Sequence, residues 1–159
     1  MMKILFVCTG NSCRSILAEA IFNSLAPSGT YAMSAGSHPT GQVHKKALEL
    51  LKEKGISTDG LYSKSWNDLE IVPDVVITVC DNAAGEACPA YLGPATRAHW
   101  GVADPAKVSG TDDEIDQAFE QSYKILRTRI ESFFNLGLER LDPKDEKLKI
   151  QLDSISHLV

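Results

Sequence analysis

"VCTGNSCRS", residues 7–15, is a glycine-bearing turn between a short apolar run and an amphipathic segment. "KILFV" (3–7) has the pattern of a fully buried strand, and "RSILAEAIFNSLA" (14–26) repeats apolar residues at every fourth position, as a helix does. A strand that leads through a turn into a helix is typical of parallel α/β folds, whose ligands bind at the carboxyl ends of the strands. We therefore expect residues 8–15 to form a binding loop at the edge of such a sheet.

The rest of the chain continues the alternation of strands and helices. Further strands are predicted at 30–36, 74–80 and about 97–102, and further helices at 43–55 and 111–136. This order predicts an α/β fold of three layers, with a central parallel sheet of about four strands flanked by helices.

The C-terminal tail carries apolar residues at helical spacing after a break at Pro143. We expect one domain over residues 1–137 and a helical extension, 138–159, that packs on the same domain. A role of this extension in a dimer contact is the alternative, although we expect a monomer.

The composition narrows the class of protein. The 159 residues are 43% hydrophobic and 23% charged, which is typical of a single globular domain. A net charge of -5 argues against broad binding to nucleic acid or to an anionic membrane. The apolar run near the N-terminus is too short for a signal peptide, so we expect a cytoplasmic protein whose four cysteines stay reduced at rest.

The loop has the residues of an oxyanion site. Five residues separate Cys8 from Arg14, so the loop can curl until its N–H groups, the guanidinium and the sulfur converge on one tetrahedral anion. The predicted oxyanion-binding residues are Thr9, Gly10, Asn11, Ser12, Cys13, Arg14 and Ser15. These groups are expected to lower the pKa of Cys8 and to make it a nucleophile. The plainer alternative is a buried cysteine at a strand end, with Arg14 in an ordinary surface ion pair.

The same loop resembles the phosphate-binding loop of low-molecular-weight protein tyrosine phosphatases, and the resemblance extends to about residue 137. These enzymes use an Asp-Pro pair in a late loop as general acid, and "WGVADPA" (100–106) contains Asp104 and Pro105. The resemblance implies their fold and assigns Asp104 the protonation of the leaving oxygen. Taken alone, an aspartate before a proline is a common turn or helix cap.

Two cysteines further along the chain have no task in the hydrolysis of a phosphate ester. Cys80 and Cys88, in "VVITVCDNAAGEACP" (75–89), resemble the redox cysteines of the arsenate reductases that share the phosphatase fold. The resemblance implies that Cys8 attacks arsenate, that Cys80 then forms a disulfide with Cys8, and that Cys88 resolves it. A thioredoxin-type partner would reduce the resulting Cys80–Cys88 disulfide.

The spacing of these two cysteines leaves the reductant open. Seven residues separate Cys80 from Cys88, whereas the thioredoxin-linked relatives have six, and other relatives use glutathione and glutaredoxin. A continuous helix over residues 80–88 would hold the two Cα atoms roughly 12 Å apart, although a disulfide requires about 4.4–6.8 Å. We therefore predict a mobile segment at 81–92. The plainer alternative for Cys88 is a small packed residue.

No cofactor is required by this chemistry, and no pair of Cys or His residues has the spacing of a zinc site. Some reductases of the family bind potassium beside the loop, and the resemblance matches Asn11, Glu19 and Ser34 to three of its ligand positions. Cys13 either forms a protective disulfide with Cys8 under oxidation or only fills space.

The expected function is thus the reduction of arsenate to arsenite for arsenic detoxification, with phosphate or sulfate as competing anions. The first alternative is a phosphatase that hydrolyses phosphate monoesters and does not depend on Cys80 or Cys88. The second is an oxyanion-binding or redox-sensing module in which Cys8 binds or oxidises without turnover. Asp104 beside a complete loop argues against binding alone, and the additional thiols argue against a simple phosphatase.

Overall fold

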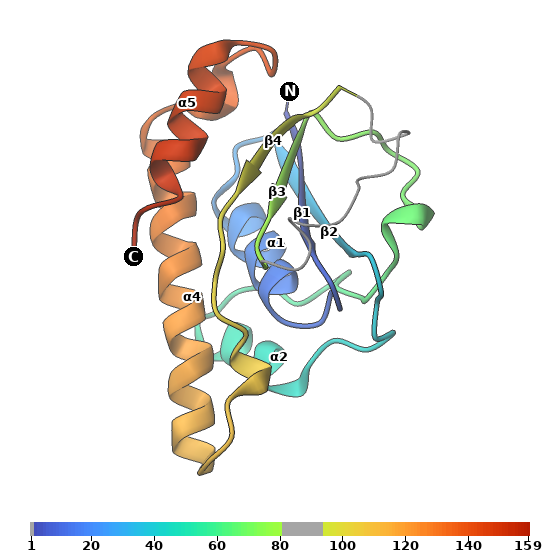
Figure 1. The fold of residues 1–159 in the computed structure, drawn as a ribbon, viewed down its shortest axis with the longest axis vertical. Coiled ribbons are helices and arrows are strands. Elements are labelled where there is room, and N and C mark those ends of the chain that lie inside the picture. The colour runs from blue at the N-terminus through green and yellow to red at the C-terminus, as the bar shows by residue number, and fades with distance from the viewer. Residues whose placement is uncertain (1, 81–93) are drawn as a thin grey trace.

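The computed structural model describes residues 2–80 and 94–159 and is built on a four-stranded parallel sheet of order β2-β1-β3-β4 (Figure 1). The strands are β1 (Lys3–Cys8), β2 (Tyr31–Gly36), β3 (Val75–Thr78) and β4 (Thr96–His99). This arrangement confirms the predicted α/β fold. Parallel strands place all their carboxyl ends at one edge of the sheet, so the residues that follow β1, β2, β3 and β4 lie close together there.

Two of the strands end earlier than predicted. β3 ends at Thr78 and β4 ends at His99. Beyond these residues the backbone makes isolated hydrogen bonds and no longer forms the regular ladder of a sheet. Val79 donates to the carbonyl of Val7, and Val102 donates to the carbonyl of Val79. The prediction that Cys80 lies within the strand is therefore wrong by two residues. Because Cys80 lies outside the strand, its side chain does not have to follow the alternation of faces along β3.

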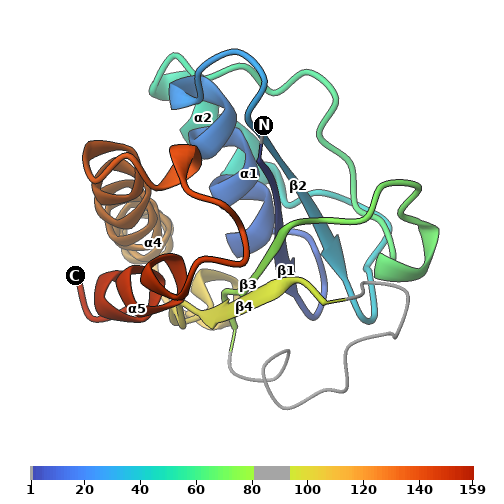
Figure 2. The same ribbon diagram turned by 90° about the horizontal axis from the view of Figure 1, so that it is seen from above.

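The helices begin and end close to the predicted positions. They are α1 (Arg14–Leu25), α2 (Lys45–Glu53), α4 (Asp112–Asn135) and α5 (Glu146–Ile155), with short 3-10 turns η1 (Trp66–Asp68), η3 (Pro105–Lys107) and η4 (Leu138–Arg140). A capping box starts α4, in which the Thr111 hydroxyl accepts from the N–H of Glu114 and the Glu114 carboxylate accepts from the N–H of Thr111. Figure 2 shows α1, α2 and α4 on one side of the sheet and the segment with η1 on the other.

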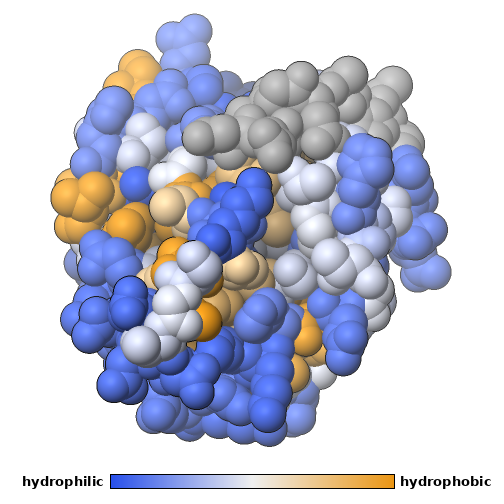
Figure 3. Space-filling model, turned by 60° about the horizontal axis from the view of Figure 1, so that its bottom comes forward, coloured by the Kyte–Doolittle hydropathy of each residue, from blue (hydrophilic) through white to orange (hydrophobic). Residues whose placement is uncertain are grey.

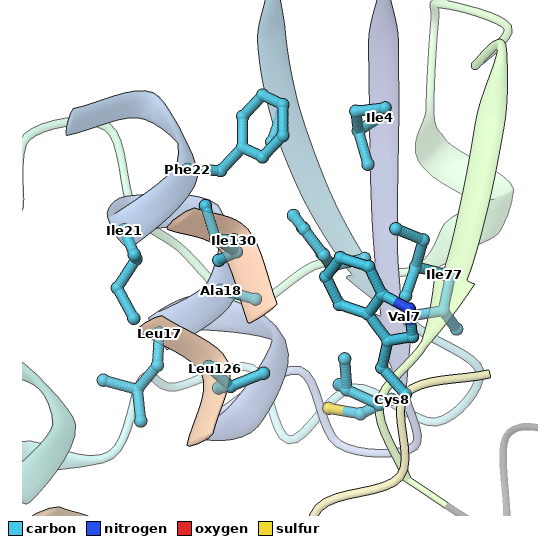
Figure 4. Packing of buried hydrophobic residues seen from close by; sticks show 14 of the residues in the cluster. Ile4, Val7, Cys8, Leu17, Ala18, Ile21, Phe22, Ile77, Leu126 and Ile130 are labelled. Atoms are coloured by element: carbon cyan, nitrogen blue, oxygen red, sulfur yellow. The ribbon is translucent and has the colours of Figure 1, made fainter. Parts of the chain in front are cut away.

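The core lies between the sheet and the layer of α1 and α4. Every residue of β1 after Lys3 is buried, as expected for a central strand covered on both faces. Figure 4 shows Leu17 and Ile21 of α1 beside Leu126 and Ile130 of α4, with Cys8 at the end of the same cluster. This packing holds the start of α1, and with it the loop before the helix, in a fixed position.

The tail after α4 returns to the edge of the sheet. In α5, Leu148, Leu152 and Ile155 are buried in the core cluster, and the indole N–H of Trp100 donates to the carbonyl of Leu152 at 3.0 Å. Arg129 of α4 donates through Nε to the carbonyl of Leu158 at 2.9 Å. The extension therefore closes the core over β4.

We expect Leu152→Ala to lower the free energy of unfolding by about 2–5 kcal/mol, because it opens a cavity in a fully packed core. Ile150 lies on the same helix and is 63% exposed, so Ile150→Ala is the matched control and should change stability by about 0.5 kcal/mol or less. Urea unfolding followed by circular dichroism compares the two. Equal effects of the two variants would mean that α5 does not pack on the domain in solution.

No helix in the described part of the chain is both long and apolar enough to cross a membrane.

Candidate active site

The loop between β1 and α1 lies at the carboxyl edge of the sheet, which Figure 3 shows as a hydrophilic face with apolar residues gathered near its middle. Asn11 has a φ of 47°, a left-handed conformation that asparagine tolerates better than most residues. Within residues 2–80 and 94–159, the N–H groups of residues 10–13 have no hydrogen-bond partner. The loop therefore presents a row of free donors beside the N-terminus of a helix, an arrangement that suits an anion.

Gly36, at the end of β2, supports the loop from behind, and the sequence analysis did not single it out. A Cβ atom on Gly36 would lie 2.5 Å from the carbonyl oxygen of Thr9 and 3.1 Å from the backbone nitrogen of Asn11. Only glycine allows the strand to approach the loop so closely. A glycine at the end of a predicted strand was the only sequence signal for this role.

We expect Gly36→Ala to displace the loop and to lower the turnover of any substrate bound there by roughly 100-fold, because a misplacement of about 1 Å has that cost. The added methyl group meets backbone atoms, which cannot rotate away as a flexible side chain can. Steady-state kinetics, together with the melting temperature, measures the effect. A fully active variant would show that the loop does not need its present position.

Cys8 is buried and has two partners that matter for its ionisation. The Ser15 hydroxyl lies 3.0 Å from its sulfur, and the Cys80 thiol is in hydrogen-bond contact with it. The Cys80 contact and burial raise the pKa of Cys8 well above its ordinary value, whereas the Ser15 hydroxyl and N–H act to lower it. This direction is opposite to the expected one. The two thiols titrate as a pair, because a negative charge on one makes ionisation of the other more costly. The hydrogen bonds from Ser15 favour Cys8 as the thiol that ionises first.

Cys80 is placed by the loop as well as by its own strand. Because β1 and β3 are neighbours in the sheet, the residues just beyond their ends face one another. The Cys80 sulfur accepts a hydrogen bond of 3.2 Å from the N–H of Thr9. The structure thus brings the two buried thiols together, as the resemblance implied.

Arg14 and Asp104 meet across the loop. Arg14 donates from Nη1 to the carbonyl of Val102 at 2.9 Å, and its Nη2 lies 3.4 Å from Oδ2 of Asp104. The Arg14 Nε atom is buried and has no hydrogen-bond partner among the described residues. Since an unpaired buried donor is costly, this atom is most simply understood as a group reserved for an anion.

The other oxygen of Asp104 accepts from the N–H of Ala106 at 2.9 Å and so caps η3. The carboxyl group is thereby held beside the guanidinium, with its position set by the turn that Pro105 begins. From the sequence, Asp104 could be either the cap of a turn or a general acid. The geometry is compatible with both at once, because one oxygen caps the turn and the other faces the loop.

A buried polar network supports the loop from the side away from Cys80. The amide of Asn11 donates to Ser15 Oγ at 2.8 Å and to Ser34 Oγ at 3.0 Å, and Ser34 donates to Glu19 at 2.6 Å. Lys64 lies beside this network, with its ammonium 3.8 Å from Glu19 Oε1 and its backbone N–H bonded to Oδ1 of Asn11 at 2.9 Å. The structure brings together the three residues matched to a potassium site. Lys64 was not foreseen, since no sequence pattern links it to the loop.

Cys13 precedes α1 and is buried. Burial is the largest cause that raises the pKa of the Cys13 thiol from 9.0 to about 11, and the Ser12 hydroxyl, 3.7 Å from the sulfur, only partly opposes it. A thiol with this pKa stays protonated at neutral pH and is a poor nucleophile. The arrangement therefore favours packing over redox chemistry for Cys13.

We expect Cys13→Ala to keep turnover within about 3-fold of the parent and to change the pH dependence of stability. Because the folded-state pKa is raised, the stabilising effect of the protonated thiol is present below about pH 9 and is lost as the pH rises through about 11. Urea unfolding at several pH values in this range should show that the parent protein loses on the order of 2 kcal/mol of its free energy of unfolding. The Cys13→Ala variant should not show this loss. Parallel pH profiles would contradict this assignment.

Cys88 and the segment predicted to be mobile, 81–92, lie outside the described residues. His99 is bonded to Thr78 through its Nδ1 at 2.7 Å, and Trp100 is buried, so this pair belongs to the framework. Among the described residues, no group of three His, Cys, Asp or Glu side chains could hold a metal ion.

Comparison with known proteins agrees with this geometry. Residues 3–147 match the family described as low molecular weight phosphotyrosine protein phosphatase. The chain belongs to this family. The site of this phosphatase-family chain contains the cysteine, arginine and aspartate expected from the resemblance, and it adds a second thiol.

Individual relatives of this phosphatase-family chain bear two kinds of name. The arsenate reductase of Halalkalibacterium halodurans is 38% identical over 136 residues, which cover 84% of this chain and 96% of that protein. The low molecular weight protein tyrosine phosphatase of T. tengcongensis has a TM-score of 0.68 at 25% identity, covering 86% of this chain and 99% of the other. The thioredoxin-dependent arsenate reductase of Corynebacterium glutamicum has a TM-score of 0.63 at 25% identity, covering 88% of this chain and 64% of that chain.

Proposed function

We propose that this protein reduces arsenate to arsenite, with Cys8 as the nucleophile and Cys80 as the second thiol. The observation that carries the proposal is the proximity of these two buried thiols at the ends of neighbouring strands, where the Cys80 sulfur accepts from the N–H of the residue after Cys8. Hydrolysis of a phosphate ester uses one thiolate, an anion-binding loop and a general acid, and it leaves Cys80 without a task. The relatives named arsenate reductase support the same choice.

Arsenate is the substrate that the loop is proposed to hold. The free N–H groups of residues 10–13 and the unpaired Nε of Arg14 provide donors around one tetrahedral anion. Thr9 and Ser15 complete the binding loop through their contacts with the two thiols. Phosphate and sulfate have the same shape and charge, so both should compete with arsenate.

The first chemical step is proposed to form a sulfur–arsenic bond. The Cys8 thiolate attacks the arsenic atom, and one oxygen leaves as water after Asp104 supplies a proton. Arg14 and the loop N–H groups neutralise the charge that collects on the remaining oxygens. Arsenic is still in its oxidised state at this point.

The second step moves the electrons. The Cys80 thiolate attacks the sulfur of Cys8, the sulfur–arsenic bond breaks, and its electron pair stays on arsenic, which leaves as arsenite. Two thiols are oxidised to a Cys8–Cys80 disulfide and arsenate is reduced by two electrons, so the step balances. Cys80 is held close to Cys8, because its sulfur accepts from the N–H of Thr9, the residue that follows Cys8.

A reductant must then restore the thiols. We assign this task to an intracellular dithiol of the thioredoxin type or to glutathione with glutaredoxin, and we assign Cys88 the role of resolving the first disulfide by attack on Cys80. Such reductants are maintained in the cytoplasm, where we place the protein as a monomer in arsenic detoxification.

The test is arsenate-dependent oxidation of NADPH by the purified protein. It is coupled separately to thioredoxin with its reductase and to glutathione with glutaredoxin, and hydrolysis of an aryl phosphate is measured in parallel. The proposal expects arsenate turnover in one of the coupled systems, and that system identifies the reductant. Ester hydrolysis without arsenate turnover in either system would instead establish a phosphatase.

A further inference from the structure

Lys64 contacts the loop network at two points. Its backbone N–H donates to Oδ1 of Asn11 and so fixes which way the amide of Asn11 turns. Its ammonium is held by the carbonyl of Tyr62 at 3.1 Å and lies over the Tyr62 ring at 4.2 Å, within 3.8 Å of Glu19. One residue thus orients the amide in the loop and supplies the positive charge nearest to the buried carboxyl group.

Lys64 and Glu19 together set the direction of the hydrogen bonds in the network. Because Glu19 only accepts, Ser34 must donate to it and therefore accepts from Asn11. The second amide hydrogen of Asn11 goes to Ser15 Oγ, which leaves the Ser15 hydrogen for the sulfur of Cys8. The orientation of the Asn11 amide, which the Lys64 N–H fixes, is thereby linked to stabilisation of the Cys8 thiolate.

The ionised form of Glu19 is costly in this position. Burial raises the pKa of Glu19, while the Ser34 hydroxyl and the Lys64 ammonium act to lower it. Removing the Lys64 charge would leave a buried carboxylate without a counter-ion and favour its protonation. A protonated Glu19 could donate to Ser34, and the Ser34 hydroxyl would then lose its charged acceptor.

A potassium ion does not fit these residues as they stand. A potassium ion needs oxygen lone pairs. One lone pair of the Ser34 oxygen is used by Asn11, and one lone pair of Oδ1 of Asn11 is used by the Lys64 N–H, so fewer are left for an ion. The Lys64 ammonium brings its own positive charge to Glu19, so a second cation beside it would be repelled.

We propose that Lys64 is a positioning residue of the active-site loop whose ammonium group replaces an alkali cation beside Glu19. The protein consequently works without potassium, and replacement of Lys64 by an acidic residue creates a need for the ion. Only the turnover arm of the test depends on the proposed function, because ion binding is also read out by stability.

The site is open to ions from solvent. A cavity of about 390 Å³ is lined by both Glu19 and Lys64, together with Tyr31, Tyr62, Asp68 and Glu70. Its acidic side chains suit the entry of a cation once the ammonium has been removed. A carboxylate introduced at position 64 would add oxygen ligands to those of Glu19, which lines the same cavity.

The experiment compares the parent protein with Lys64→Asp in potassium chloride and in tetramethylammonium chloride at equal ionic strength. For the parent, we expect the melting temperature and arsenate turnover to be the same in both salts. For Lys64→Asp in the tetramethylammonium salt, turnover should fall by roughly 10-fold or more, because the introduced carboxylate and Glu19 repel each other beside the loop and displace it. Potassium should restore most of this loss and raise the melting temperature of the variant by about 3 °C or more.

Two further variants keep the test decisive. Lys45→Asp makes the same change of charge at an exposed position of α2 and should behave as the parent in both salts. Lys64→Arg keeps the positive charge and should remain indifferent to potassium, so it replaces Lys64→Asp if that variant does not fold. A potassium-specific rise in the melting temperature of the parent or of Lys64→Arg would overturn the inference, as would a folded Lys64→Asp that behaves like Lys45→Asp. Loss of all arsenate turnover in the parent would overturn the proposed function instead.

Discussion

Cys80→Ser should abolish arsenate turnover and leave the hydrolysis of an aryl phosphate intact. The serine hydroxyl cannot form a disulfide with Cys8, so the route that carries two electrons to arsenic is removed and not merely slowed. We expect arsenate-dependent NADPH oxidation to fall by roughly 1,000-fold or more, to the level of the blank. Ester hydrolysis requires only the loop, Arg14 and Asp104, which the substitution leaves in place.

The substitution should also change the ionisation of Cys8. The contact with Cys80 is the largest cause of the raised pKa of Cys8, so its removal should lower that pKa. Alkylation of Cys8 by iodoacetamide, followed over pH by mass spectrometry of the labelled peptide, measures the shift. The expected midpoint for Cys80→Ser lies below that of the parent, and ester hydrolysis should reach its maximum at a lower pH.

Cys13→Ala is the matched control, because it also removes a buried thiol from the site without touching the proposed relay. It should retain both activities. If Cys80→Ser kept its arsenate turnover, electrons would reach arsenic by another thiol and the contact between Cys8 and Cys80 would have no catalytic meaning. If both variants lost both activities, the loop would depend on its thiols for packing alone.

The fold was predictable because its signals are local. β1 has the pattern of a buried strand because it is apolar after Lys3, and α1 and α4 have apolar residues at helical spacing. Only α4 also has a recognisable start, the capping box. Strand ends were less predictable. β3 was expected to continue to Cys80, but whether a residue joins a ladder depends on the neighbouring strand, and that partner is distant in the sequence.

The residues of the site likewise include some that the local sequence predicts and others that it does not. Cys8, Arg14 and Ser15 lie within one short motif, so their convergence could be inferred from spacing and from the resemblance. Gly36 and Lys64 reach the loop from other segments, and a glycine or a lysine is too common to mark such a contact. The pKa of Cys8 was predicted in the wrong direction because the effect of Cys80 exceeds that of the loop donors. A sequence motif does not show how strongly a residue from a distant segment, such as Cys80, affects the pKa of Cys8.

Arg14→Lys should impair both activities together, by roughly 100-fold to 1,000-fold in kcat/KM. Each nitrogen of the guanidinium has a different role. Nη1 donates to the carbonyl of Val102, Nη2 pairs with Asp104, and Nε has no protein partner among the described residues and is available to the anion. A lysine ammonium is a single charged point and cannot reproduce this fork. The variant would either lose the contact with the loop that carries Asp104 or leave the bound anion without its donor.

Arg127→Lys is the control, since half-buried Arg127 contacts only Glu131 and Tyr123 of its own helix in the described residues, and neither belongs to the loop. Steady-state kinetics with arsenate and with an aryl phosphate, and the inhibition constant of phosphate, separate the two consequences of Arg14→Lys. Weakened phosphate binding with loss of both activities indicates that the donor to the anion has been removed. Unchanged phosphate binding with a lower kcat indicates that Asp104 has been displaced, because a general acid acts on the leaving oxygen and not on the resting complex. A variant with the kinetics of the parent would mean that Arg14 is structural and that the loop N–H groups alone hold the anion.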